Sequence, residues 1–259
     1  MSVNLVIGTS HKTYFGYQQT RQWCSQVAEI VRQQPPALLA QLELFTFPAT
    51  PALESALQCF AGSPMATGAQ NICGAPQGAW TGENAAEMVS EMGGRYAEIG
   101  HAERRRYFAE TTDLIQQKIA RAYASQLTPV ICIGEEREVS PTQAAETAIQ
   151  QADELLVACV GQPLPATIFA WEPQWAIGAE KPASDGYIRH VCKTLRSHLH
   201  EKYGSQCQVI YGGSAGPGLL SRLWPEVDGI FLGRFAHQPS AFSELLAEAR
   251  QILGELNQY

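Results

Sequence analysis

The chain has 259 residues, and its 25 acidic against 18 basic side chains leave a formal net charge of −7 with histidine neutral. Hydrophobic residues make up 45% and charged residues 17%, a balance typical of a globular protein with a substantial core. The acidic charge excludes broad binding of nucleic acid or anionic membranes, and no apolar run approaches the roughly 18 residues of a membrane span. Seven scattered cysteines without a C-x-x-C pair favour reduced thiols over disulfides or zinc, and predict a cytosolic protein.

Short apolar runs alternate with longer amphipathic stretches about eight times along the chain. The runs are apolar on both faces, as expected of parallel strands buried between other layers. They are Val3–Ile7, Leu42–Phe45, Ala66–Ala69, Tyr96–Ile99, Val130–Ile133, Thr167–Ala170, Val209–Tyr211 and Gly229–Leu232. The first run starts so early that we expect no signal peptide before it.

Three of the intervening stretches show helical spacing, with apolar side chains three and four residues apart. They are Trp23–Val31, Thr112–Tyr123 and Ile188–Leu199. We expect Asp185 to cap the last of these helices and Gly204 to end it. The alternation predicts right-handed crossovers and a parallel sheet, closed as a single-domain (β/α)8 barrel over residues 1–259. An open doubly wound sheet is the alternative.

In a (β/α)8 barrel the functional groups follow the carboxyl ends of the strands. Lys12 follows the first strand, and His101 follows the fourth within a Gly-His-Ala-Glu-Arg-Arg run. Taken singly, each has an ordinary interpretation: a solvated surface lysine and a hydrogen-bonded structural histidine. Glu172 follows the sixth strand beside two tryptophans and a proline, where burial would raise its pKa toward that of a general base.

Glycines gather after the last two strands, in Gly212-Gly213-Ser214 and Gly233-Arg234. They let backbone N–H groups approach an anion closely, and these loops hold phosphate in many barrels. Turns also favour glycine, so each segment alone is weak evidence. Five strand ends that each supply a suitable group together indicate an active site.

Several motifs resemble those of the triosephosphate isomerase family, in the family's order and nearly its spacing. The most specific are Gly100-His101-x-Glu103-Arg104-Arg105, Glu172-Pro173-x-Trp175-Ala176-Ile177-Gly178 and Tyr211-Gly212-Gly213-Ser214. Further matches are Ala69-Gln70-Asn71, Gly78-Ala79-Trp80-Thr81-Gly82-Glu83 and Ile131-Cys132-Ile133-Gly134-Glu135. The resemblance runs from the first strand to the last and implies a single (β/α)8 TIM barrel.

The resemblance also implies the reaction, an aldose–ketose isomerisation of glyceraldehyde 3-phosphate and dihydroxyacetone phosphate through an enediolate. It implies that Glu172 moves a proton between adjacent carbons and that a neutral His101 polarises the carbonyl. Lys12 would supply fixed positive charge against the phosphate and the developing enediolate. No metal or organic cofactor is implied, and the partner that the resemblance implies is a small phosphorylated sugar.

The remaining parts of the site follow from the same resemblance. Pro173–Ala183 would form a lid that excludes water, and Ile177 and Phe231 would clamp the base from opposite sides. The expected phosphate cradle consists of the backbone N–H groups of Gly178, Ser214, Gly233 and Arg234.

The resemblance further implies contacts around the site and between subunits. Arg104 would pair with Glu83 and brace the active site. Thr81, at the tip of the loop after the third strand, would reach the neighbouring subunit. A homodimer is therefore expected.

The chain departs from the family at positions that line the substrate. Ser10 stands where the family has a substrate-binding asparagine, Ala102 where it has a serine, and Arg234 where it has a glycine. Phe231 replaces a leucine, and Pro182 fixes φ near the far hinge of the lid. The smaller Ser10 makes room, and Arg234 adds a bidentate donor.

The start Thr9-Ser10-x-Lys12 and the end Gly233-Arg234 resemble a divergent branch, the erythrulose-phosphate isomerases, which act on four-carbon ketose phosphates. The alternative is neutral variation in an ordinary triosephosphate isomerase. A catalytically inactive sugar-phosphate-binding relative is a third hypothesis, but joint retention of Lys12, His101 and Glu172 argues against it. The lid motif argues against a fourth, a phosphate-binding epimerase or synthase.

Overall fold

The chain forms a closed barrel of parallel strands. The structure, a computed structural model, describes residues 5–256, and the eight strands in this range pair in chain order until β8 meets β1. The strands are β1 (Leu5–Ser10), β2 (Leu42–Phe47), β3 (Met65–Ala69), β4 (Tyr96–Ile99), β5 (Thr128–Ile133), β6 (Thr167–Trp171), β7 (Cys207–Tyr211) and β8 (Gly229–Leu232). The predicted (β/α)8 TIM barrel is confirmed and the open sheet is excluded. Val3, predicted in the first strand, lies outside the described residues.

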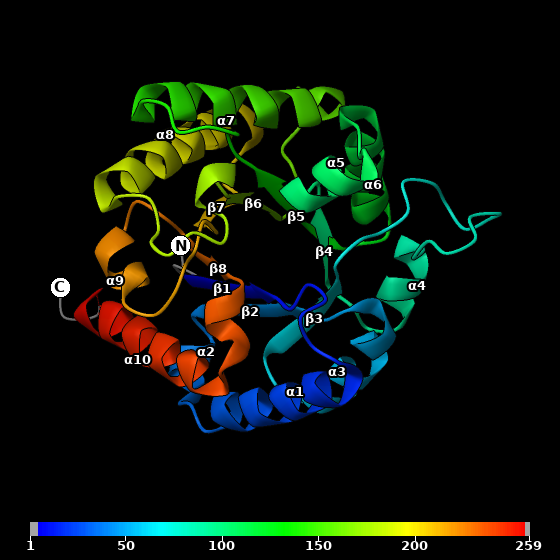
Figure 1. Cartoon of the computed structure of the whole chain (residues 1–259), viewed down its shortest axis with the longest axis vertical. Coiled ribbons are helices and arrows are strands. Elements are labelled where there is room, and N and C mark those ends of the chain that lie inside the picture. The colour runs from blue at the N-terminus through cyan, green and yellow to red at the C-terminus, as the bar shows by residue number, and fades with distance from the viewer. Residues whose placement is uncertain (1–4, 257–259) are drawn as a thin grey trace.

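Helices surround the barrel and cover the outer face of the strands (Figure 1). The α-helices are α1 (Tyr17–Arg32), α2 (Pro36–Leu39), α3 (Leu53–Phe60), α4 (Ala86–Glu91), α5 (Ala102–Phe108), α6 (Thr112–Ala124), α7 (Pro141–Leu155), α8 (Asp185–Tyr203), α9 (Leu219–Leu223) and α10 (Pro239–Leu256). Short 3₁₀ helices are η1 (Thr50–Ala52), η2 (Val157–Cys159), η3 (Gln174–Ala176) and η4 (Arg234–His237). The three helices predicted from apolar spacing lie within α1, α6 and α8.

The cap predicted for α8 is wrong by one residue. Ser184 has extended backbone, and its hydroxyl accepts a hydrogen bond from the backbone N–H of Tyr187. Asp185 is instead the first helical residue, and its carboxylate accepts a hydrogen bond from Arg222. Gly204 ends the helix as predicted, with a φ of 96° that glycine adopts without strain.

The core has two layers, one between strands and helices and one inside the barrel. Aromatic rings fill much of the interior: Phe45 stacks on Tyr96 with ring centroids 4.6 Å apart and also lies beside Phe231. Gly8 of β1 makes room for them, because a Cβ there would lie 2.3 Å from the Phe45 ring. The interior is therefore a packed core, which leaves only the ends of the barrel for binding.

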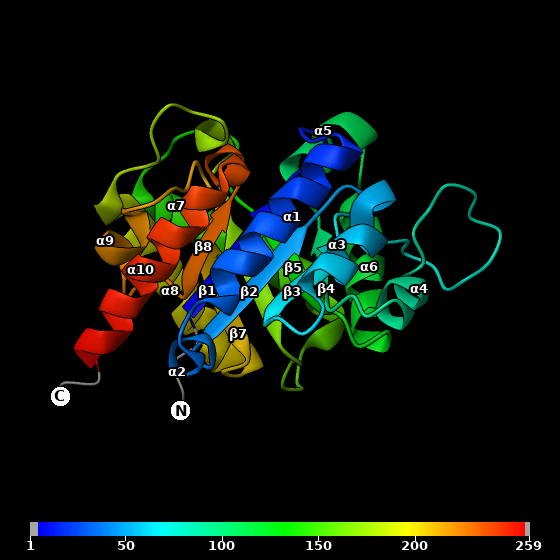
Figure 2. The same cartoon turned by 90° about the horizontal axis from the view of Figure 1, so that it is seen from below.

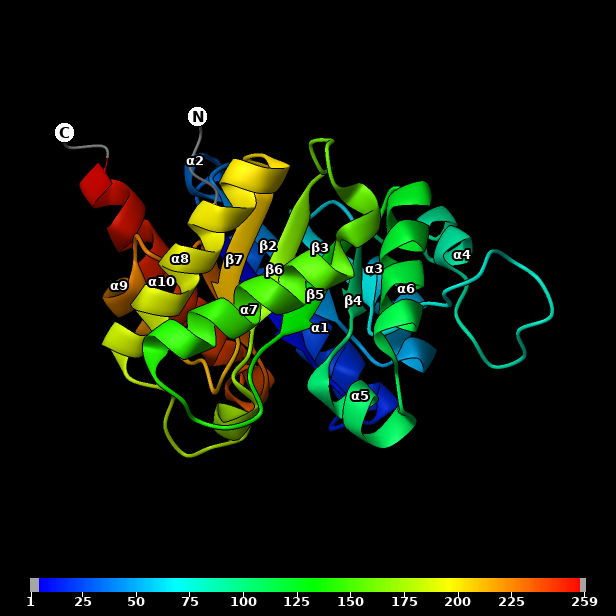
Figure 3. The same cartoon turned by 90° about the horizontal axis from the view of Figure 1, so that it is seen from above.

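The two ends of the barrel differ in what covers them. Figures 2 and 3 place α2, which precedes a strand, at one end and α5, which follows β4 directly, at the other. The long loop of residues 70–85 between β3 and α4 reaches away from the barrel in all three views. None of the described helices is both long and apolar enough to cross a membrane.

Candidate active site

The residues predicted for the site surround one cavity of about 190 Å³ at the carboxyl ends of the strands. Its lining includes Ser10, Lys12, His101, Glu172, Ile177, Gly178, Ser214, Phe231, Gly233 and Arg234. Tyr14 and Phe235 also line it, although no motif of the sequence marked them. The closed topology brings these segments together, since all parallel strands end at the same rim.

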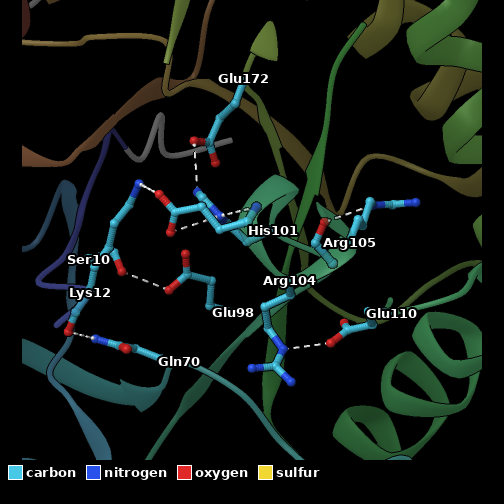
Figure 4. Close-up of polar contacts among 11 residues, drawn as sticks. Ser10, Lys12, Gln70, Glu98, His101, Arg104, Arg105, Glu110 and Glu172 are labelled. Atoms are coloured by element: carbon cyan, nitrogen blue, oxygen red, sulfur yellow. Dashed lines mark hydrogen bonds and ion pairs between the residues drawn. The ribbon is translucent and has the colours of Figure 1, made fainter. Parts of the chain in front are cut away.

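Glu172 directly follows β6 and points at His101 (Figure 4). Glu172 is 6% exposed, and its Oε2 lies 3.5 Å from Nε2 of His101. The other oxygen, Oε1, is buried and finds no hydrogen-bond partner among the described residues. A buried acceptor without a donor costs free energy, so this oxygen is placed to accept a hydrogen bond from a bound molecule.

His101 serves as the N-cap of α5, which is a structural role, and it also lines the cavity beside Glu172. Its Nδ1 accepts a hydrogen bond from the backbone N–H of Glu103 at 3.1 Å. Burial lowers the pKa of His101, but the Glu172 carboxylate outweighs burial and raises the pKa to about 9. A ring with this pKa would be an imidazolium at neutral pH, but an imidazolium has no acceptor nitrogen, so the hydrogen bond to Nδ1 is the geometry of a neutral ring. Its single proton lies on Nε2, facing Glu172.

Lys12 follows β1 and has a left-handed backbone conformation, which contacts with the surrounding residues maintain. Its φ is 48°, a strained value for a residue with a side chain, and the Gln70 amide donates to its carbonyl at 2.8 Å. The ammonium contacts Oε1 of Glu103 at 2.6 Å. Burial lowers the pKa of Lys12, but this hydrogen bond and the charge of Glu172 raise the pKa above its ordinary value. The side chain is therefore a fixed cation in the cavity.

The near end of the predicted lid is anchored by Glu135, which the sequence marked only as part of a motif. Its carboxylate accepts hydrogen bonds from the indole N–H groups of Trp171 and Trp175, at 3.1 and 3.0 Å. It also accepts one from the Tyr187 hydroxyl at 3.1 Å. These three hydrogen bonds fix the position at which the chain leaves β6 and enters the predicted lid.

The far part of the lid is held by β7 and the loop after it. The Ser214 hydroxyl donates to the carbonyls of Ala176 and Ala179, at 2.8 and 3.0 Å. The backbone N–H of Ala183 donates to the Tyr211 hydroxyl at 3.1 Å. Ser214, predicted to act through its backbone N–H, thus also holds the lid with its side chain.

Arg234 contacts the lid through its guanidinium. Its Nη2 donates to the carbonyl of Gly178 at 2.7 Å. Gly178 has a φ of 72°, which turns the lid at this residue. A glycine at position 234 could not make this contact, so the departure from the family pattern has a structural consequence.

Glu98 is a residue of the site that motif reasoning missed. It lies on β4, is 4% exposed, and accepts a hydrogen bond from the Ser10 hydroxyl at 2.9 Å (Figure 4). Burial raises the pKa of Glu98 to about 7. A signal was present, because an acidic residue interrupts the apolar run Tyr96–Ile99.

Within one chain, Arg104 does not pair with Glu83 as predicted. Arg104 contacts Glu110 at 2.6 Å, and the buried ammonium of Lys118 contacts the same carboxylate oxygen at 2.7 Å. Glu110 follows α5 and is itself buried. Burial would raise the pKa of Glu110, but hydrogen bonds from Lys118 and Arg104 lower it below its ordinary value. The buried carboxylate of Glu110 thus pairs with cations of two neighbouring helices, Arg104 of α5 and Lys118 of α6.

No metal-binding arrangement is found within residues 5–256, where no three His, Cys, Asp or Glu side chains cluster suitably. The seven cysteines are free thiols. The cavity instead offers a carboxylate, an imidazole and an ammonium from three strand ends, which is a set suited to proton transfer beside an anion.

Fold and site together define an isomerase of the (β/α)8-barrel class. The family model described as "Triosephosphate isomerase" matches residues 5–249, and the chain belongs to that family. The chain is thus an enzyme of the triosephosphate isomerase type, an isomerase of phosphorylated sugars.

Individual relatives differ in their similarity to the chain. It is 49% identical over 250 residues to the L-erythrulose-1-phosphate isomerase of Pectobacterium atrosepticum, and the matched region covers 96% of each chain. It is 31% identical over 248 residues to the probable triosephosphate isomerase 2 of Listeria monocytogenes, covering 93% of this chain and 96% of that one. It is 35% identical over 226 residues to the triosephosphate isomerase of Thermus thermophilus, covering 85% and 89%.

Proposed function

We propose that Glu172, His101 and Lys12 carry out the isomerisation of a short sugar phosphate. Glu172 removes a proton from the carbon next to the carbonyl, and the C–H electron pair becomes the C=C bond of an enediolate. The Nε2–H of His101 donates its proton to the carbonyl oxygen as charge develops there. Glu172 then returns the first proton to the former carbonyl carbon, while His101 recovers a proton from the hydroxyl of the carbon that was first deprotonated, which becomes the new carbonyl.

The observation that carries this proposal is the buried contact between His101 and Glu172. Nε2 lies 3.5 Å from Oε2, and the ammonium of Lys12 lines the same cavity. Lys12 stabilises the enediolate and phosphate charge, which matters in a protein of net charge −7. A carboxylate, an imidazole and a fixed cation suffice for this chemistry, so it requires no metal or organic cofactor.

The phosphate is proposed to lie at the opposite side of the cavity from β4. The backbone N–H groups of Gly178, Ser214, Gly233 and Arg234 would cradle it. Ile177 and Phe231 line the cavity beside Glu172 and would press on the base when the lid closes.

The family reaction, between glyceraldehyde 3-phosphate and dihydroxyacetone phosphate, is the first candidate for the natural substrate pair. L-erythrulose 1-phosphate is the second, and the 49% identity to a relative that bears its name favours it. The two ketoses differ by one group, because the tetrulose carries a hydroxymethyl on the carbon from which the proton is removed. Its isomerisation moves the carbonyl one carbon further from the phosphate and gives another four-carbon ketose.

A side-by-side steady-state assay with both substrates tests the proposal. We expect turnover by the wild-type protein, and a loss of about 100-fold or more in kcat for Glu172→Asp, because the shortened base stands away from the carbon. No turnover of either substrate, together with binding of inorganic phosphate, would support the non-catalytic relative instead.

We also propose that the enzyme is a cytosolic homodimer. The loop of residues 70–85 carries Thr81 and an exposed Trp80 away from the barrel. Met88 and Met92 beside it are also exposed, which gives this side an apolar surface suited to a second subunit. Light scattering should give twice the 28.3 kDa chain mass, and Thr81→Arg should shift the protein to the monomer. A wild-type monomer at micromolar concentration would contradict the dimer.

A further inference from the structure

Glu98 is a buried carboxylate that the proposed mechanism does not use. On β4, Ala97 and Ile99 pack against the helices, whereas Tyr96 belongs to the core inside the barrel. Side chains alternate along a strand, so Glu98 shares the inward face with Tyr96 and lies nearer the carboxyl end. A carboxylate at such a position destabilises the folded state unless it is well paired. Sites of this kind are retained where function requires them.

The partner of Glu98 is the residue that replaces the family asparagine. Ser10, at the end of β1, donates its hydroxyl to Oε2 of Glu98 at 2.9 Å. The contact joins residues 88 positions apart in the chain. An asparagine would offer an amide donor and an acceptor from one side chain. Here the Ser10 hydroxyl is the donor and the Glu98 carboxylate is the acceptor. The pair is buried beside His101 and Lys12 (Figure 4).

The pair lies where two cavities meet. Ser10, Lys12, His101 and Glu103 line both the catalytic cavity and a second one of about 520 Å³. Glu98 lines the second cavity, which extends toward Gln70, Asn71 and the loops after β2 and β3. The segments proposed to cradle phosphate follow β6, β7 and β8, on the other side of the barrel. A substrate held at both places would therefore point its end without phosphate toward Glu98.

We infer that the Ser10–Glu98 pair binds the terminal hydroxymethyl of a four-carbon ketose phosphate and so determines the chain length of the substrate. The hydroxyl of that group donates to the Glu98 carboxylate, and the Ser10 hydroxyl orients the carboxylate. A three-carbon ketose lacks the group and leaves the pair unused. This inference rests on the proposed isomerase function and names the substrate class of the same cavity.

The test compares kcat/KM for L-erythrulose 1-phosphate and for dihydroxyacetone phosphate in wild type, Glu98→Gln and Glu43→Gln. Glu43, at the amino-terminal end of β2, accepts a hydrogen bond from the Tyr96 hydroxyl and lies away from both cavities, so it is a matched control. We expect Glu98→Gln to lower kcat/KM for the tetrulose about tenfold or more, chiefly through KM, and that for the triose less than about threefold. Glu43→Gln should leave the ratio of the two values unchanged.

The outcomes separate this inference from the function on which it rests. An equal loss for both substrates, or a wild type that turns over only the triose, overturns the inference and leaves the isomerase proposal standing. A wild type inactive on both substrates overturns both proposals. If Glu98→Gln does not fold, Ser10→Ala takes its place and should lower the tetrulose-to-triose ratio in the same direction.

Discussion

Gly212 leaves the space that the Glu172 side chain occupies: a Cβ on Gly212 would lie 2.5 Å from Cγ and 2.8 Å from Cδ of Glu172. The glycine predicted to serve a phosphate therefore also positions the proposed base. The relationship joins the end of β7 to the end of β6, two strands that pair along their length.

Gly212→Ala should displace the Glu172 carboxylate without unfolding the barrel. We expect kcat to fall about 100-fold or more with a smaller change in KM, because an error of about 1 Å at a reacting group has an effect of this size. Steady-state kinetics and circular dichroism measure the two effects. Gly186→Ala is the matched control, since a Cβ there meets nothing within 4 Å. A variant with wild-type kcat would show that Glu172 tolerates the displacement.

Glu135→Gln should loosen the anchored end of the lid. The carboxylate accepts three hydrogen bonds from Trp171, Trp175 and Tyr187, and an amide can serve only some of these donors. We expect the free energy of unfolding to fall by about 1–3 kcal/mol and KM to rise. Urea titration and initial rates check both expectations. Unchanged tryptophan fluorescence and unchanged KM would contradict the anchoring role.

Stability should depend on pH through Glu98. Burial raises its pKa from 4.5 to about 7, so between these values the folded state holds a proton that the unfolded state has released. The contribution of Glu98 to the free energy of unfolding is therefore fully present below about pH 4.5, and it is lost as the pH rises toward 7. We expect the stability advantage of Glu98→Gln over wild type to grow by roughly 3 kcal/mol from pH 4 to pH 8. Parallel stability curves for the two proteins would refute this expectation.

Arg234→Met should weaken substrate binding more than it slows turnover. The substitution keeps an apolar stem but removes the hydrogen bond to the Gly178 carbonyl, which holds the lid beside the cavity. A net contribution of about 1 kcal/mol corresponds to a rise in KM of about fivefold, with kcat nearly unchanged. Arg234→Lys keeps one donor and should lie between the two. Equal KM in all three proteins would mean that only the backbone of Arg234 serves the site.

The sequence by itself determined the barrel and the strand ends that carry its chemistry. Apolar runs buried on both faces, separated by helical spacing, are local patterns, and only a parallel sheet with helical crossovers satisfies all of them at once. Lys12, His101 and Glu172 each follow a strand, so closure of the sheet brings them to one rim. Their place could be predicted because it depends on the order of elements.

Only the tertiary structure decided the partners of those residues. Ser10 meets Glu98 across 88 positions, and Arg104 meets Glu110 where Glu83 was expected. Such contacts depend on strand register, side-chain rotamers and burial. These act over a few ångströms and produce no recognisable spacing of residues in the sequence from which the contact could be predicted. The buried acid of β4 was visible as a charge in an apolar run, but what it binds follows from where the closed barrel places it.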